Sequence, residues 1–443
     1  MSKRIGITGI LLLFLFAASA QKKLSYIEVD NKSYELHKQQ KWEELIEFSA
    51  EVRKQGMDFF YLQARTGIAY YNLKKYRNAA DWLLKAWEND QSFEWLQEYL
   101  YYSLVYGGRS TEASKIAADF TVALKQKIFF QYMKPLRVAF ESGYSFNPDF
   151  DKQTNGSHHE EIGVGDNYGE AFYLNNYHFE SLDYSHQTAP GINLNHNFTY
   201  IGINREEQVY WGSLNTFPIK TNQYQYFLNP ILVLGEKLYV SPSISVVWGN
   251  SDMFLGYYNS SDQKDFYSSP VKFSDFIFST SMWSHFGNFS PGAEINFANV
   301  NNEGFTQFSG WTTVYPLSNT DLYFTPRVYL KTDAEGNIAY NAFGISGGAQ
   351  LGPLHFYGQY LNGDMKNFVE SAGYVIANFP GKSEQKLSGS IYFPKGKRYQ
   401  FVLRYINQNI TEKYQVYTDG TPSNSMEYNY TKHTLTGGIS WNF

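Results

Sequence analysis

The chain ends on the stretch KHTLTGGISWNF, residues 432–443, in which apolar and polar side chains alternate. One set of alternate positions holds Leu435, Ile439, Trp441 and Phe443, and the other set is polar or glycine. Because successive side chains of a β-strand point to opposite faces, this spacing predicts a strand with one apolar and one polar face. Its 12 residues are about the length that a tilted strand needs to cross a bilayer. We therefore predict a membrane-spanning strand.

The aromatic residue at the very end carries a second signal. An amphipathic last strand that stops on a residue such as Phe443 resembles the signal read by the outer-membrane barrel assembly machinery. The resemblance implies that Ile439, Trp441 and Phe443 form this assembly signal, and that the machinery and outer-membrane lipid are partners. A sandwich strand that happens to end the chain is the alternative interpretation.

The same alternation recurs upstream. It predicts strands over residues 386–393 and 399–406, joined by a tight turn at residues 394–397. Because the final strand must end in the periplasm, we expect this turn to be periplasmic and residues 410–427 to form an outside loop. Residues 135–443 comprise 309 positions, and a hairpin of two spanning strands takes roughly 40 residues, which predicts an antiparallel barrel of about 14 strands, with 12–16 allowed.

The composition agrees with a barrel. Aromatic residues make up 19% of the chain, charged residues 18%, and the mean hydropathy is −0.43. An ordinary soluble domain has about 25% charged residues. No run of about 18 apolar residues follows residue 20, which excludes a helical membrane protein. The chain has no Cys, which excludes disulfides, thiol nucleophiles and lipid-modified cysteine.

The first twenty residues predict export. Lys3 and Arg4 form a short basic region, an apolar stretch follows from Ile5 to Ala18, and Ala18 and Ala20 are small residues at the positions that signal peptidase requires. We predict a signal peptide over residues 1–20, with a retained anchor as the alternative.

The composition shifts near residue 134. Residues 21–134 carry 17 Lys and Arg against 15 Asp and Glu, whereas residues 135–443 carry 18 against 27. The first part has helical spacing of its apolar residues, and Pro135 would end a helix and favour extended geometry at Lys134. We predict a periplasmic helical domain over residues 21–134 and an outer-membrane barrel over residues 135–443.

The helical part has an internal period. Trp42, Tyr76 and Ser110 follow one another at intervals of 34 residues. The segment 61–86 resembles the tetratricopeptide repeat, a helical hairpin of this length. Its small positions, where the two helices touch, are matched by Gly67 and Ala79, and its apolar packing positions by Tyr70, Tyr76, Leu83 and Ala86.

Tetratricopeptide repeats bind partners in a groove lined by the first helix of each hairpin. The resemblance carries the groove positions to Tyr61, Tyr71 and Asn72 in the middle copy and to Trp95, Glu98, Tyr102 and Tyr106 in the third. Such an aromatic groove suits a periplasmic protein or the sugar rings of a polysaccharide. The alternative is that these aromatics pack on a neighbouring helix or on the barrel rim.

The sequence contains little catalytic chemistry. Asp149, Asp151 and residues 158–161 cluster acidic and histidine side chains, but their spacing fits no EF-hand, and a solvated loop is the preferred interpretation. The adjacent pairs Ser185–His186 and Ser284–His285 would point to opposite faces of a strand. We therefore expect no enzyme activity, no cofactor and no metal, and the negative barrel argues against nucleic acid.

Three function classes follow. A periplasmic repeat domain joined to an outer-membrane barrel resembles exopolysaccharide exporters in architecture, which favours a channel or an envelope transport component. An outer-membrane scaffold that recruits periplasmic or envelope proteins is the alternative, and an outer-membrane hydrolase is a weaker one. The aromatic, Asn-rich style resembles uncharacterised outer-membrane proteins of Bacteroidota.

Overall fold

The computed structural model describes residues 24–131, 134–155, 168–235, 237–333, 336–419 and 421–443. The chain divides into two units, Met1–Leu100 and Tyr101–Phe443. The predicted signal peptide, residues 1–20, lies outside the described residues. Among the residues that are described, no helix is both long and apolar enough to cross a membrane.

The first unit is helical. Its helices are α2 (Tyr26–Lys38), α3 (Trp42–Lys54), α4 (Phe60–Asn72) and α5 (Tyr76–Asn89), and α6 (Glu94–Tyr106) crosses the border between the units. The start of α2 follows from a capping box, in which the Ser25 hydroxyl accepts from the Glu28 backbone N–H and the Glu28 carboxylate accepts from that of Ser25. Apolar residues at helical spacing, such as Leu45, Leu62 and Leu83, form the interior.

Helices α4 and α5 approach closely at Gly67. A Cβ at this position would lie 2.6 Å from Leu83 Cγ and 3.3 Å from the Leu83 backbone nitrogen. Ala79, Leu83 and Ala86 are fully buried, whereas Tyr70 and Tyr76 are half-buried. These are the positions that the repeat pattern assigns to packing, and their membership of a tetratricopeptide repeat stays a prediction.

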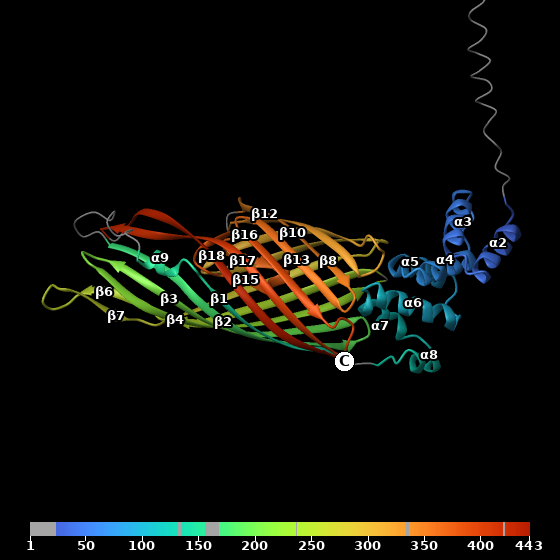
Figure 1. The fold of residues 1–443 in the computed structure, drawn as a ribbon, viewed down its shortest axis with the longest axis horizontal. Coiled ribbons are helices and arrows are strands. Elements are labelled where there is room, and N and C mark those ends of the chain that lie inside the picture. Colours follow the sequence, from blue (N-terminus) through green and yellow to red (C-terminus); the bar gives the residue numbers. More distant parts are fainter. Residues whose placement is uncertain (1–23, 132–133, 156–167, 236, 334–335, 420) are drawn as a thin grey trace, which may run out of the picture. The chain divides into compact units, whose positions relative to one another are not determined.

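The second unit is dominated by a closed antiparallel barrel of 14 strands, preceded by the helices, which confirms the predicted fold class and strand number. The barrel strands are β1 (Pro135–Phe146), β2 (Tyr168–Ala189), β3 (Ile192–Tyr210), β4 (Leu214–Leu234), β5 (Leu238–Ser251), β8 (Val271–Trp283), β9 (Phe289–Val300), β10 (Glu303–Val314), β11 (Leu322–Thr332), β12 (Ile338–Leu351), β13 (Leu354–Gly363), β16 (Lys382–Phe393), β17 (Tyr399–Thr418) and β18 (Thr421–Asn442). Strands β1 and β18 pair in register from Arg137 with Asn442 to Phe146 with His433, which closes the ring (Figure 1).

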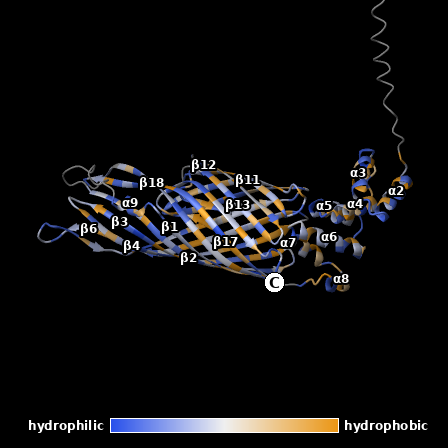
Figure 2. Cartoon of the chain, viewed as in Figure 1, coloured by the Kyte–Doolittle hydropathy of each residue, from blue (hydrophilic) through white to orange (hydrophobic). Residues whose placement is uncertain are grey.

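The two faces of the barrel wall differ as the last strand predicts. On β18 the side chain of Leu435 is 56% exposed on the outer face, whereas its neighbour Thr436 is 4% exposed on the inner face. The pattern holds around the ring, where Phe276 and Leu403 face outward and Ser279 faces inward. Figure 2 shows the resulting alternation of hydrophobic and hydrophilic residues along the strands. The outside of the wall is apolar and the inside is polar.

We call the end at which β1 begins and β18 ends the terminal rim, and the opposite end the distal rim. The hairpin of β6 (Phe254–Tyr258) and β7 (Lys264–Ser268) projects at the distal rim, opposite the C-terminus (Figure 1). Residues 410–427 were predicted to be a loop, but 410–418 instead continue β17 and 421–427 belong to β18, which pairs with it. The part of β17 that extends beyond its pairing with β16 pairs instead with residues 168–170 of β2. This pairing satisfies backbone groups that a loop would have left to water.

A short helix packs on the terminal rim. It is α7 (Ser110–Ala117), which is followed by α8 (Val122–Lys127), while α9 (Phe150–Thr154) lies after β1. The Ser114 hydroxyl accepts from the backbone N–H of Gly191 at 3.0 Å, and Lys115 Nζ donates to the carbonyl of Val233 at 3.1 Å. Beside these contacts, Arg109 and Glu112 form a buried ion pair at 2.6 Å. Polar contacts thus join α7 to the turns of the barrel.

The contact of Gly67 with Leu83 makes a testable prediction. Gly67→Val would force α4 and α5 apart, and we expect a destabilisation of about 1–3 kcal/mol, as overpacking of a tight contact usually causes. Hydrogen exchange measured by mass spectrometry on the full chain should show faster exchange in α4 and α5 and no change in the barrel strands. Glu51→Ala, on the exposed side of α3, is the matched control. Unchanged exchange in α4 and α5 would contradict the packing described.

Candidate functional site: the barrel lumen and the loop that crosses it

The segment between β13 and β16 folds into the barrel. We call Asp364–Gly381 the lumen loop; it contains β14 (Phe368–Glu370), a single 3-10 turn at Ser371–Gly373 and β15 (Val375–Ala377). Strands β14 and β15 pair with each other as a two-stranded hairpin. The loop starts and ends at the distal rim, yet its side chains contact the inner face of the wall.

The lumen loop spans the full width of the barrel. Next to its tip Glu370 contacts Lys386 on β16, and at the tip the carbonyl of Ala372 accepts from the Ser243 hydroxyl on β5 at 2.6 Å. In the strand order, β5 is the seventh strand from β16 in a ring of 14. These two strands therefore lie on opposite sides of the barrel, and the loop must cross the lumen to touch both.

Polar side chains of the wall hold the loop in place. Lys386 Nζ lies 2.6 Å from a Glu370 oxygen, and both side chains are 9% exposed. Gln307 on β10 donates to the carbonyl of Val369 at 2.6 Å and accepts from its backbone N–H at 3.2 Å. Tyr374 donates from its hydroxyl to Asp183 on β2 at 3.1 Å. The wall thus binds the loop mainly through hydrogen bonds and ion pairs of its amide, carboxylate and lysine side chains.

Apolar contacts add to this hold at two points. Val369 packs in a cluster with Ile277 and Phe305, and Phe368 packs in another, where its ring centroid lies 4.9 Å from that of Tyr329. Short apolar runs in the loop therefore find partners on the inner wall, although most of the inner wall is polar.

The tip of the loop has an unusual backbone. Ser371, Ala372 and Gly373 all have positive φ, at 52°, 57° and 91°. Residues other than glycine are disfavoured in this region by roughly 1–2 kcal/mol each. Such strain persists only where the surroundings determine the conformation, and here Gln225 donates to the carbonyl of Gly373 at 3.2 Å. The wall contacts therefore hold a loop conformation that the tip would not adopt alone.

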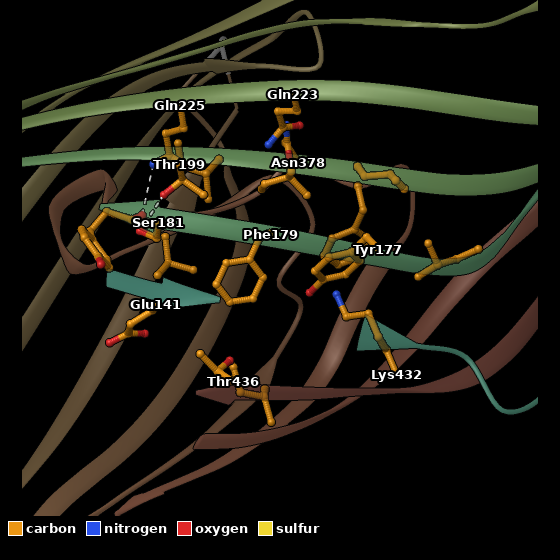
Figure 3. A pocket seen from close by; sticks show the side chains of 18 of the residues that line it. Glu141, Tyr177, Phe179, Ser181, Thr199, Gln223, Gln225, Asn378, Lys432 and Thr436 are labelled. Atoms are coloured by element: carbon orange, nitrogen blue, oxygen red, sulfur yellow. Dashed lines mark hydrogen bonds between the residues drawn. The ribbon is translucent and has the colours of Figure 1, made fainter. Parts of the chain in front are cut away.

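A cavity remains between the lumen loop and the wall. Its volume is about 250 Å³. It is lined by apolar residues of β2 and β3, among them Phe179, Ile201 and Ile203, and by Val375, Ile376 and Phe379 of the lumen loop. Figure 3 shows the Phe179 ring near the centre of this cavity, with Gln223, Gln225 and Asn378 along one side.

The charges around the cavity are unequal. Three cations, Arg205, Arg404 and Lys432, line it against one carboxylate, Glu141. Arg404 is paired with Glu141 at 2.7 Å, and Arg205 lies 3.6 Å from a Glu412 oxygen. Lys432 has no such carboxylate within the part of the chain that the structure describes.

The aromatic residues predicted to line a groove are partly exposed. Tyr61 is 43% and Trp95 38% exposed, and both rings contact that of Phe60, at 5.1 and 6.3 Å between centroids. Tyr71 lies 5.0 Å from Tyr99 by the same measure. Of the remaining predicted positions, Asn72 donates to the Ile68 carbonyl of its own helix. The rings of Tyr102 and Tyr106 stack on each other, and Glu98 lies on the same helix. A groove function for them stays a prediction.

The other residues singled out from the sequence have no site around them. Ile439, Trp441 and Phe443 are exposed on the outer face of β18 and at its end. Residues 158–161 of the acidic cluster lie outside the described residues, and within the described part no three metal-ligating side chains gather. His285 hydrogen-bonds Ser290 at 2.7 Å, but both are buried in a turn at the terminal rim.

The lumen loop itself was missed by the sequence reasoning, which expected only turns and loops between strands. The available signal was the pair of short apolar runs Phe368–Val369 and Val375–Ile376 within a segment between two spanning strands. Each is too short to cross a membrane, so each needed an apolar partner elsewhere.

Comparisons with known proteins give fold neighbours only. No protein-family model and no curated protein matches the chain. Among solved structures, a FadL homologue of Pseudomonas aeruginosa is similar at 7% identity and a TM-score of 0.44, covering 74% of this chain and 94% of that one. The toluene transporter TodX of P. putida is similar at 8% and 0.42, with the same coverage. The translocator domain of the autotransporter NalP from Neisseria meningitidis is similar at 9% and 0.30, covering 77% and 99%.

At these scores the names of the neighbours carry no statement about what this chain does.

The ion pair of Glu370 with Lys386 makes a second prediction. Removing one partner of a buried pair leaves an uncompensated charge, which typically costs about 3–5 kcal/mol. Lys386→Met should therefore loosen the lumen loop, seen as faster hydrogen exchange over residues 368–377 in the chain reconstituted in lipid. The double variant Lys386→Met, Glu370→Gln should recover most of the protection because no unpaired charge remains. Exchange in Lys386→Met as slow as in the unaltered chain would show that the pair does not hold the loop.

Proposed function

We propose that this chain is an outer-membrane barrel through which small solutes pass when the lumen loop leaves the lumen. The observation that carries the proposal is that the loop is held across the barrel by polar side chains of the wall, such as Lys386, Gln307 and Asp183. Water can replace such partners, whereas it cannot replace an apolar core. A loop held mainly in this way, with its apolar contacts confined to a few positions such as Phe368 and Val369, can be released without unfolding the barrel.

The wall supports a place in the outer membrane. Its outward side chains are apolar over residues such as Leu403 and Leu435, and its backbone groups are paired around a closed ring. Lipid permits spanning strands only in closed barrels, because it offers no hydrogen bonds to an open edge. The terminal rim would then face the periplasm, as a role of Phe443 in an assembly signal would require.

The lumen supports passage rather than anchoring alone. The inner wall carries charged side chains, among them Glu141, Arg205, Glu294 and Arg327, so a lumen freed of the loop would be lined by groups that water can solvate. Barrels of this size enclose a polar interior that is open or plugged by a loop. The lumen loop makes the described conformation a closed one.

A second candidate is recruitment of a periplasmic or envelope partner, either a protein or a polysaccharide, by the helical unit. The ring cluster of Phe60, Tyr61, Phe93 and Trp95 favours it, because two of these aromatic side chains are more than a third exposed. Exposed aromatic rings stack readily on sugars and peptides. A passage function and a recruiting unit are compatible, since they use different residues of the chain.

The passage function is tested by conductance in a planar bilayer. Replacing residues 366–379 with a short glycine linker should raise single-channel conductance at least about tenfold over the unaltered chain, because it removes the segment that joins opposite sides of the lumen. Replacing residues 256–266, the tip of the β6–β7 hairpin outside the lumen, by the same linker is the matched control and should change nothing. A loop-deleted barrel that folds but does not conduct would overturn the proposal.

Recruitment is tested by binding of soluble glycans and envelope peptides to the full chain. Trp95→Ala and Tyr61→Ala should each weaken the binding by about 0.5–1.5 kcal/mol, the usual contribution of a stacked ring. Tyr258→Ala removes an aromatic of similar exposure in the β6–β7 hairpin and should have no effect. Equal losses in all three variants, or none in any, would argue against a binding surface on the helices.

A further inference from the structure

The cavity beneath the lumen loop contains a lysine without a charged partner. Lys432 on β18 is 7% exposed and lines the cavity. Its Nζ lies 5.3 Å from the ring centroid of Tyr177 and 5.0 Å from that of Phe379. Within the described residues, it makes no hydrogen bond and no ion pair beyond these ring contacts. Figure 3 shows its amino group directed toward Tyr177, at one end of the cavity.

The other charges at this cavity cancel. Arg404 and Glu141 neutralise each other at 2.7 Å, and Arg205 has Glu412 at 3.6 Å. Lys432 therefore gives the cavity a net positive charge. The ammonium of Lys432 has two ring contacts, each of which contributes about 0.5–2 kcal/mol, and no carboxylate offsets its charge.

Most of the remaining cavity surface is apolar, and its polar part consists of amide and hydroxyl side chains, Ser181, Thr199, Gln223, Gln225, Asn378 and Thr436. Phe179, Ile201 and Ile203 form one wall, and Ile376 of the lumen loop forms the facing one. Amides are present at the edge, where Gln223 already accepts from Asn378 at 2.9 Å. A sugar, which carries hydroxyl groups all around its ring, would leave those that face these apolar side chains without partners.

We propose that this cavity binds a small organic monoanion with a compact apolar body, whose charged group pairs with Lys432 and whose body packs against Phe179, Ile201 and Ile376. The inference rests on the proposed passage function, because such a solute would be the one that the lumen loop encloses. The cavity volume of about 250 Å³ suits a solute with a single ring or a short branched chain, and it is too small for a polymer.

The inference is tested by equilibrium dialysis of radiolabelled phenylacetate against the full chain in lipid nanodiscs, where no detergent competes. Phenylacetate should bind saturably, while its neutral isostere phenylacetamide and the small anion acetate should each bind at least about tenfold more weakly. The two comparisons separate the contribution of the charge from that of the apolar body without any change in the protein.

Three variants then test the assigned residue. Lys432→Met should weaken phenylacetate binding at least about tenfold, and Lys432→Arg should keep most of the affinity, because it retains the charge. Lys413→Met removes a lysine whose side chain is 59% exposed and should change nothing. Equal affinity for phenylacetate and phenylacetamide, an unchanged affinity in Lys432→Met, or no saturable binding would each overturn the inference.

The outcome is distinguishable from that of the passage function. Conductance of the loop-deleted barrel without phenylacetate binding to the intact chain would overturn this inference alone. Phenylacetate binding to the intact chain without conductance of the loop-deleted barrel would overturn the passage function and leave a binding site in a closed barrel.

Discussion

The rest of the structure depends on the pairing of β1 with β18. A spanning strand in lipid has no water to satisfy its backbone, so a sheet of 14 strands is tolerated only when its first and last edges meet. The register from Arg137 with Asn442 to Phe146 with His433 achieves this, and it fixes which side chains face inward. Once Leu435 points to the outside, Lys432 and Thr436 must point to the lumen, because the period of a strand is two.

Closure creates an interior that must be filled by something other than a conventional core. The inward positions carry serine, asparagine, glutamine and paired charges, and they bond both to one another and to the lumen loop. A typical hydrogen bond within a protein contributes only about 0.5–1.5 kcal/mol net, since water competes for both partners. The loop is thus held by many exchangeable contacts at a strained tip, Ser371 to Gly373, and this combination favours a movable segment over a permanent filling.

The sequence was informative about features that depend on residues close together in the chain. Alternation along residues 432–443 predicted the outward face of β18, and Pro394 to Lys397 were correctly predicted to join two strands. Two features escaped prediction because their partners are distant in the chain. The hairpin of β17 and β18 is extended through pairing with residues 168–170, and the lumen loop is placed by Ser243, Asp183 and other side chains over a hundred positions away. Charge pairing around the cavity is equally invisible in sequence, because Arg404 and Glu141 come from opposite ends of the barrel domain.

The cavity and the lumen loop are thermodynamically coupled, because Val375, Ile376 and Phe379 belong to both. A solute that fits only the described conformation would stabilise it, and by linkage the loop would raise the affinity for that solute to the same degree. Such a solute would keep the barrel closed. Passage therefore requires that the solute bind comparably well when the loop has moved, through groups that stay on the wall. Lys432 and Phe179 are wall residues, so the charge and one apolar surface remain available to a solute after the loop has left.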